Sequence, residues 1–208
     1  MHPWYTHYDP GVPKEAPRPW LLTDLLRENA RRYAHKVALE FLGRSLSYQS
    51  LWQQVEAFAK GLQEAGLKPG DRVAIMLPNS PQFVIAFYGT LLAGGVAVNT
   101  NPMYTPRELG HQLRDSGARV LVILDLLLPR YQEVKAETPV EVLVRTGIQD
   151  YLPFPKNLLY PLMLKRKGQA PRSLEGTPWR VVSISGTTVT MLYGDTTITL
   201  TVGQALGK

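Results

Sequence analysis

The segment SISGTTVTMLYGD, residues 183–195, places short hydroxylated side chains around a glycine. Ser185, Gly186, Thr187 and Thr188 are residue types found in loops that bind phosphate, because backbone N–H groups near a glycine can converge on one anion and hydroxyls add donors. Such a loop could hold the phosphates of a nucleotide. The alternative is a turn between two strands, since the same small residues are common in β-turns.

The residues that follow the glycine favour the turn. Val189 opens a stretch rich in threonine and β-branched residues, which is typical of a strand. A strand commits its N–H groups to a sheet ladder, so they no longer converge on phosphate. We interpret residues 183–195 as a hairpin turn with its flanking strands.

Two histidine groups are candidates for metal binding or catalysis. His2 and His7 flank aromatic residues, with Asp9 nearby, but no third imidazole or further carboxylate completes a zinc-type ligand set. His111 lies one helical turn from Asp115, and no serine occurs in a G-x-S-x-G elbow. We interpret the first group as part of an ordinary arm and the second as a surface pair.

Helix termini and glycines supply the remaining candidates. Asn79 and Ser80 precede a proline at a helix start, where they could bind an anion, but capping the helix is their ordinary role. The stretch GTLLAGGVAV lacks the G-x-G-x-x-G spacing and follows a helix rather than a strand. We therefore predict no catalytic, cofactor-binding or metal-ligating residue in this chain.

The composition is that of an ordinary globular protein. Of the 208 residues, 44% are hydrophobic and 19% are charged, and there is no cysteine, which excludes disulfides and thiolate metal sites. The net charge of +6 is scattered, with one basic run at Lys165-Arg166-Lys167, so we expect no nucleic-acid partner. The longest apolar run, VLVILDLLL, is too short to span a bilayer. The expected location is the cytoplasm.

Helical and strand patterns alternate from Leu21 to about Thr146. Apolar spacing predicts a helix over 49–65, and capping signals predict helices over 81–92 and 106–116, the latter with a capping box at Thr105 and Glu108. Apolar runs predict buried strands at RVAIML, GGVAVNT, ARVLVIL and VEVLVRT. This alternation predicts an α/β fold, layered, with a mainly parallel sheet and flanking helices.

The chain divides into four parts by composition. Residues 1–20 are predicted to be an extended N-terminal arm, 21–149 the α/β layered domain, and 150–178 a proline-rich excursion or linker. Residues 179–208 are predicted to be a short antiparallel β meander, with a two-residue turn at Gly194-Asp195. Within the linker, NLLYPLMLKRK could lie on a membrane surface, although Pro161 and the short length weigh against that interpretation.

Residues 68–125, from KPGDRVAIML to ARVLVILD, resemble the adenylate-forming superfamily and specifically the long-chain fatty acid CoA ligases (acyl-CoA synthetases). The resemblance covers roughly residues 15–178 and implies the first part of a large N-terminal domain. It also implies fatty acid, ATP and CoA as partners, with magnesium. In that family the fatty acid is joined to the α-phosphate of ATP, pyrophosphate is released, and the acyl group passes to CoA.

The resemblance implies a phosphate loop of the form T-G-G-T-T-G-x-x-K-G. Here Val189 stands where a glycine is expected and Leu192 where the lysine is expected. The adenine-binding stretch, the acidic residue for magnesium and ribose, the hinge and the C-terminal domain have no counterpart. We therefore expect a truncated N-terminal portion of a fatty acid CoA ligase that does not catalyse the reaction and that holds no cofactor itself.

Two other interpretations remain open. The tail could be a non-enzymatic binding or assembly module that adds strands to the sheet of a partner. A working ligase with a divergent loop would require another chain to supply the rest of the site. A sheet with uncovered edges and helix faces also predicts self-association.

Overall fold

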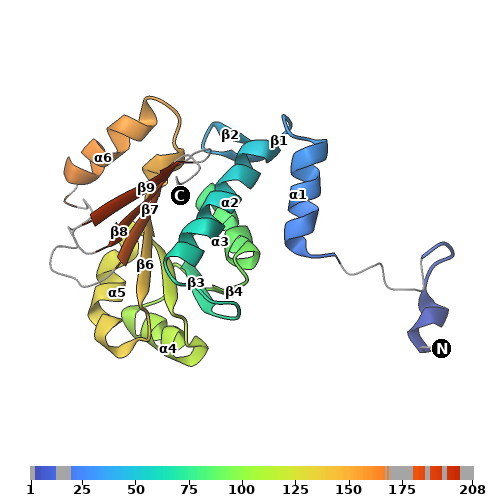
Figure 1. Ribbon diagram of the computed structural model, residues 1–208, viewed down its shortest axis with the longest axis horizontal. Coiled ribbons are helices and arrows are strands. Elements are labelled where there is room, and N and C mark those ends of the chain that lie inside the picture. Colours follow the sequence, from blue (N-terminus) through green and yellow to red (C-terminus); the bar gives the residue numbers. More distant parts are fainter. Residues whose placement is uncertain are drawn as a thin grey trace, which may run out of the picture.

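The computed structural model describes residues 3–12, 20–166, 168, 180–185, 188–193 and 196–201. Its main element is a seven-stranded sheet with the order β4-β3-β5-β6-β7-β8-β9, accompanied by a separate two-stranded sheet, β1-β2. Helices cover both faces of the main sheet (Figure 1). The predicted α/β layered architecture is therefore confirmed.

The bounds of the elements are as follows. The strands are β1 (Val37–Phe41), β2 (Arg44–Ser47), β3 (Arg72–Met76), β4 (Val96–Asn99), β5 (Val120–Leu124), β6 (Val142–Thr146), β7 (Arg180–Ser185), β8 (Thr188–Tyr193) and β9 (Thr196–Thr201). The α-helices are α1 (Leu22–Arg32), α2 (Tyr48–Glu64), α3 (Pro81–Leu92), α4 (Pro106–Ser116), α5 (Leu128–Val134) and α6 (Lys156–Arg166). The 3-10 helices are η1 (Pro3–His7), η2 (Asp125–Leu127), η3 (Lys135–Glu137) and η4 (Ile148–Tyr151).

The sheet changes from parallel to antiparallel along its width. Strands β4, β3, β5 and β6 pair in parallel, as expected for strands joined by helical crossovers. Strand β7 pairs in parallel with β6, and β8 and β9 then follow in antiparallel order. The first strand of the predicted meander therefore continues the sheet of the preceding strands.

Two hydrophobic clusters fill the space between the sheet and its helices. Successive side chains of a strand point to opposite faces, so Val73 and Ile75 join the cluster under α2 and α3, whereas Ala74 and Met76 join the cluster under α4 and α5. The side chains of β5 alternate between the two clusters in the same way, and this strand is buried along its whole length. Burial on both faces explains why these strands read as continuous apolar runs.

The predicted helix-start signals lie where the structure begins its helices. The Ser80 hydroxyl accepts a hydrogen bond from Phe83 N at 3.4 Å at the start of α3. At α4, Thr105 N donates to Glu108 Oε2 at 2.9 Å and Glu108 N donates to the Thr105 hydroxyl at 3.4 Å, which is the predicted capping box. Gly117 follows α4 with a φ of +62°.

Two segments differ from the sequence expectation. Pro3–His7 forms a 3-10 helix where an extended arm was predicted. In the predicted linker, residues Lys156–Arg166 form the helix α6, which continues across Pro161. Apolar residues occur on more than one side of this helix, so the sequence shows no clear helical period there. None of the helices among the described residues is both long and apolar enough to traverse a lipid bilayer.

Candidate functional site

The carboxyl edge of the parallel strands is the place where an α/β sheet ordinarily binds ligands. The chain passes from β3 to β4 on one side and then to β5 on the other, so the strand order reverses around β3. A crevice forms outside the strand ends at such a reversal. The segments that leave β3 to β6 at this edge are residues 77–80 after β3, 100–105 after β4, Asp125 after β5 and 147–151 after β6.

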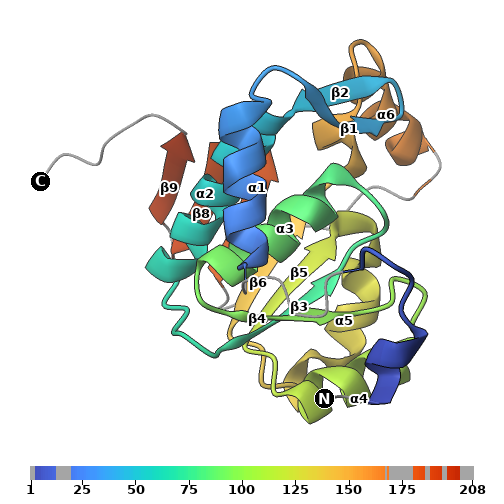
Figure 2. The same ribbon diagram turned by 90° about the vertical axis from the view of Figure 1, so that its right-hand side faces the viewer.

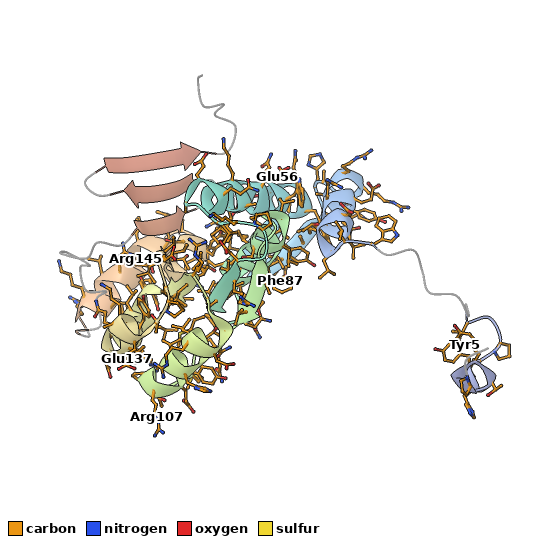
Figure 3. The ribbon with its side chains drawn as sticks, turned by 60° about the horizontal axis from the view of Figure 1, so that its bottom comes forward. Tyr5, Glu56, Phe87, Arg107, Glu137 and Arg145 are labelled. Carbon is orange, nitrogen blue, oxygen red and sulfur yellow. The ribbon has the colours of Figure 1, made fainter. Side chains whose placement is uncertain are left out.

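Asp125 is a buried carboxylate at this edge. Its Oδ1 accepts a hydrogen bond from Leu126 N at 2.8 Å, and its Oδ2 accepts from Gln149 Nε2 at 3.4 Å. Burial raises the pKa of the Asp125 carboxyl above its ordinary value, while the hydrogen bonds from Gln149 and Leu126 and the charge of Arg145 act against that rise. Arg145, labelled in Figure 3, is a residue of β6, the neighbouring strand.

Asp150 is the second carboxylate of the cluster. Its Oδ2 accepts from Gly147 N at 2.9 Å and from the Thr146 hydroxyl at 3.1 Å, which closes the turn after β6. Burial raises the pKa of Asp150, the hydrogen bonds from Gly147 and Thr146 lower it, and the charge of Asp125 adds to the rise. The negative charge of Asp125 therefore disfavours the charged form of Asp150.

Three neighbouring elements hold the turn of residues 147–151 in place. Gln82 of α3 donates through Nε2 to the Gly147 carbonyl at 2.9 Å. Arg44 of β2 donates to the Asp150 carbonyl at 2.9 Å and lies 5.4 Å from the centre of the Tyr151 ring. The Tyr151 hydroxyl donates to Gln54 Oε1 of α2. Asp150 and Tyr151, the first residues of the predicted excursion or linker, are thus held by contacts with the preceding residues.

The hydrogen bonds of Asp125 and Asp150 hold the turns after β5 and β6. The described part of the chain contains no group of three or more histidine, aspartate or glutamate side chains that could hold a metal ion. The Oε1 atoms of Gln82 and Gln149 are buried without a protein partner. Each of these amide oxygens can therefore still accept a hydrogen bond.

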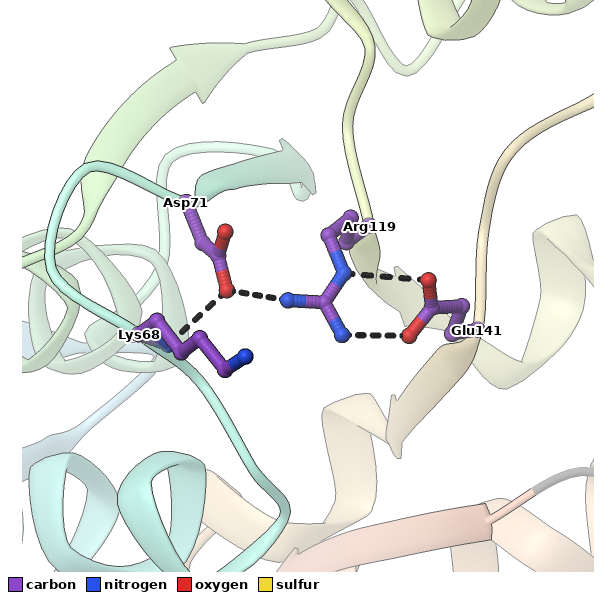
Figure 4. A network of polar contacts seen from close by, with 4 residues as sticks. All are labelled: Lys68, Asp71, Arg119 and Glu141. Atoms are coloured by element: carbon purple, nitrogen blue, oxygen red, sulfur yellow. Dashed lines mark hydrogen bonds and ion pairs between the residues drawn. The ribbon is translucent and has the colours of Figure 1, made fainter.

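A second polar network lies at the opposite, amino-terminal edge of the sheet. Arg119, which precedes β5, bridges Asp71 before β3 and Glu141 before β6 (Figure 4), with 3.0 Å between Arg119 Nε and Glu141 Oε1. The hydrogen bond from Arg119 lowers the pKa of Glu141. All three residues precede parallel strands. We therefore interpret the network as a structural one that holds the starts of β3, β5 and β6 together.

The structure does not bring the other sequence candidates together into a site. His7 and Asp9 are exposed near η1, whereas His2 lies outside the described residues. His111 and Asp115 are exposed on α4 with no hydrogen bond or ion pair recorded between them, although both line an open groove of about 1010 Å³. Arg107 lines the same groove and points away from the body of the molecule (Figure 3).

The hydroxyl-rich segment lies between two antiparallel strands. Ser185 at the end of β7 is paired with Thr188 at the start of β8, which leaves two residues for the turn. Those two residues, Gly186 and Thr187, lie outside the described part of the chain, as does the predicted turn at Gly194-Asp195. The antiparallel pairing on both sides agrees with the hairpin interpretation.

Sequence reasoning did not identify Asp125 and Asp150. A usable signal was present for Asp125, because it directly follows the apolar run VLVIL and the carboxyl end of a buried parallel strand faces the ligand crevice. No comparable signal marks Gln54, which lies inside the apolar spacing of the helix predicted over 49–65, or Gln82, which lies at the start of the helix predicted over 81–92. Their partners become visible only when the turn after β6 is placed.

Comparison with known proteins assigns the chain to a family. A family model described as AMP-binding enzyme matches residues 26–190. The chain is 45% identical over 166 residues to a long-chain-fatty-acid CoA ligase of Bacillus subtilis (strain 168), covering 79% of this chain and 30% of the relative. It is 39% identical over 165 residues to the corresponding ligase of Escherichia coli O157:H7, covering 78% of this chain and 29% of the relative.

Solved structures agree at the level of the fold. An anthranilate CoA ligase in complex with anthranoyl-AMP is similar with a TM-score of 0.60 and 23% identity, covering 85% of this chain and 34% of that chain. A benzoate CoA ligase from Burkholderia xenovorans LB400 is similar with a TM-score of 0.57 and 24% identity, covering 61% of this chain and 26% of that chain. The chain thus spans about 30% of the length of its curated relatives, and it belongs to the AMP-binding enzyme family.

Proposed function

We propose that this chain is the first part of the large N-terminal domain of a long-chain fatty acid CoA ligase. The identity to ligases of that name over most of the chain supports the assignment. The complete reaction would join a fatty acid to the α-phosphate of ATP, release pyrophosphate, and transfer the acyl group to CoA. Fatty acid, ATP and CoA are the corresponding partners, and the cytoplasm is the location that we propose.

We further propose that the 208-residue chain does not form an acyl adenylate by itself. The observation that carries this proposal is the antiparallel pairing of Ser185 with Thr188. The pairing engages the backbone of β7 and β8 in a sheet, whereas a phosphate loop must leave several N–H groups free to converge on one anion.

The side chains available also fit magnesium and ATP poorly. Leu192 stands where the family places a lysine, so the segment lacks the cation that would balance phosphate charge. Asp125 and Asp150 are engaged by the turns that they cap, and the described residues contain no metal-binding group of three.

The test is release of pyrophosphate from ATP in the presence of magnesium and palmitate. We expect the purified chain to give the rate of the protein-free blank, with the Bacillus subtilis ligase as the positive control. Palmitate-dependent release above the blank would overturn the proposal that the chain is inactive. A double variant, Val189→Gly with Leu192→Lys, tests the loop argument, and we expect it to increase ATP binding in titration calorimetry relative to the parent chain.

The alternative function, a binding or assembly module acting through the β tail, stays a prediction. Strand β9 is an outer strand of the sheet, which is the position that strand addition requires. No contact among the described residues favours a particular partner.

A further inference from the structure

Helix α6 exposes an apolar face to solvent. Leu158, Leu159 and Leu162 are each more than half exposed, and Met163 is 41% exposed. Their spacing places them along one side of the helix. Leu164, on the other side, is buried against the domain. The helix is therefore apolar on its inner and outer sides, and packing within the domain explains only the inner one.

Two further apolar side chains extend this face. Phe154, just before α6, is 79% exposed, and Leu42, at the tip of the β1-β2 hairpin, is also exposed. The hairpin lies beside α6 (Figure 2), and Leu42 lines with Leu159 and Met163 an apolar groove of about 360 Å³. We define the α6 patch as Leu42, Phe154, Leu158, Leu159, Leu162 and Met163.

Leu42 occupies an unfavourable backbone position. It has a φ of +50° and precedes Gly43 with a φ of +93°, so the hairpin has a two-residue turn in which both residues are left-handed. Asparagine, aspartate or glycine is favoured at the first of these positions, and a leucine there is strained. Backbone preference does not explain a leucine at the tip, where its side chain is more than half exposed and adds to the apolar groove beside α6.

Basic side chains border the α6 patch. Lys156 stands at one end of the helix and lines the groove, and Lys165 and Arg166 stand at the other end. None of the three forms an ion pair among the described residues. The sequence from 151 to 174 contains five basic residues and no acidic one. An apolar surface with cations at its border is complementary to an anionic lipid surface.

We propose that the α6 patch binds the surface of an anionic lipid bilayer. The leucines and Phe154 enter the boundary between headgroups and acyl chains, while Lys156, Lys165 and Arg166 contact lipid phosphates. The length of α6 suits a helix that lies in the plane of the membrane, since it is too short to cross one. The inference does not depend on catalysis by the chain, although a lipid surface is where long-chain fatty acids concentrate.

The test is partitioning of the full chain onto lipid vesicles, measured by co-sedimentation. We expect binding to vesicles of mixed phosphatidylcholine and phosphatidylglycerol, much weaker binding to phosphatidylcholine alone, and loss of binding as salt is raised. A Leu162→Trp variant should shift its fluorescence to shorter wavelength on the mixed vesicles. The work is done at protein concentrations where light scattering finds monomers.

Two double variants separate the apolar and electrostatic contributions. Leu158→Gln with Leu162→Gln should lower partitioning about ten-fold, because two exposed leucines no longer enter the lipid. Lys165→Gln with Arg166→Gln should lower it about 25-fold, since each cation contributes about five-fold near an anionic surface. The matched control, Met103→Gln with Arg107→Gln, makes the same kinds of change on an exposed loop and helix elsewhere and should leave partitioning unchanged.

The proposal is overturned if the patch variants and the control bind equally, or if both vesicle types bind the parent chain equally. It is also overturned if the parent fails to bind vesicles while the leucine variant abolishes association between copies of the chain, since the patch would then be a protein interface. Circular dichroism establishes that each variant is folded. If the leucine variant unfolds, the lysine and arginine variant decides the outcome.

Discussion

Asp125 illustrates how a single side chain can serve the fold at an electrostatic cost. Its carboxyl is buried and held by Leu126 N and Gln149 Nε2, and burial raises its pKa. Because the pKa is higher in the folded state, the folded chain binds more protons than the unfolded chain between the ordinary and the raised pKa. The free energy of unfolding therefore falls as the pH rises through that interval.

Replacing this carboxyl with an amide should remove the cost. We expect Asp125→Asn to increase the free energy of unfolding at pH 7 and to flatten its dependence on pH above about pH 4. Asparagine can still accept from Leu126 N, and its amide can donate to the unpaired Oε1 of Gln149. Urea unfolding across a pH series provides the measurement.

The control for this series is Asp115→Asn, at an exposed aspartate of α4. It should change neither the stability at pH 7 nor the pH profile beyond experimental scatter. If Asp125→Asn destabilises the chain at pH 7, the charged carboxylate is favourable in the folded state and the interpretation of its burial is wrong.

At the scale of secondary-structure elements, the close packing of α2 against α3 depends on one glycine, Gly89. A Cβ atom at Gly89 of α3 would lie 2.5 Å from Phe58 Cδ1 and 3.2 Å from the Val55 carbonyl oxygen, both in α2. The helices therefore approach as closely as they do because this position has no side chain. Phe58 belongs to the hydrophobic cluster that joins both helices to the sheet.

We expect Gly89→Ala to destabilise the chain by about 1 kcal/mol, because overpacking outweighs the gain in helix propensity. Thermal and urea unfolding measure the change. Combining it with Phe58→Leu should give less destabilisation than the sum of the single changes, since the smaller side chain relieves the contact.

Glu56→Ala, at an exposed position of α2 labelled in Figure 3, is the matched control and should have little effect. Strict additivity of Gly89→Ala and Phe58→Leu would refute the proposed close contact between the two helices.

At the scale of the whole molecule, the sheet ends on two open sides. Strands β4 and β9 are its outer strands, and the α6 patch adds exposed apolar surface. Unpaired strand edges and apolar patches both favour association between copies. Pairing of β7 with β6 moves one open edge outward to β9 without removing it.

We expect the purified chain to associate with itself as its concentration rises. Size-exclusion chromatography with light scattering should give a mean mass above the monomer mass of 23.3 kDa at high concentration. The double variant Leu158→Gln with Leu162→Gln shows which surface makes the contact. If this variant still associates, the contact is at a sheet edge rather than at the α6 patch. A sharp monomer peak at every concentration would contradict the prediction.

Much of the fold could be predicted because its signals are local. Ser80 and Thr105 mark helix starts through hydrogen bonds that involve only neighbouring residues. The site was harder to predict, because Asp150 and Tyr151 owe their positions to Arg44, Gln54 and Gln82 on three other elements. Contacts over such sequence distances leave no periodic pattern.

The sequence by itself determined the α/β class, the family resemblance and the absence of a glycine and a lysine from the hydroxyl-rich segment. These depend on residue type and short-range spacing. Only the tertiary structure decided that β7 continues the parallel sheet, that the turn after β6 belongs to the core, and that α6 presents apolar side chains outward. Each depends on which distant segment lies alongside, and burial and strand pairing are properties of that neighbour as much as of the residue itself.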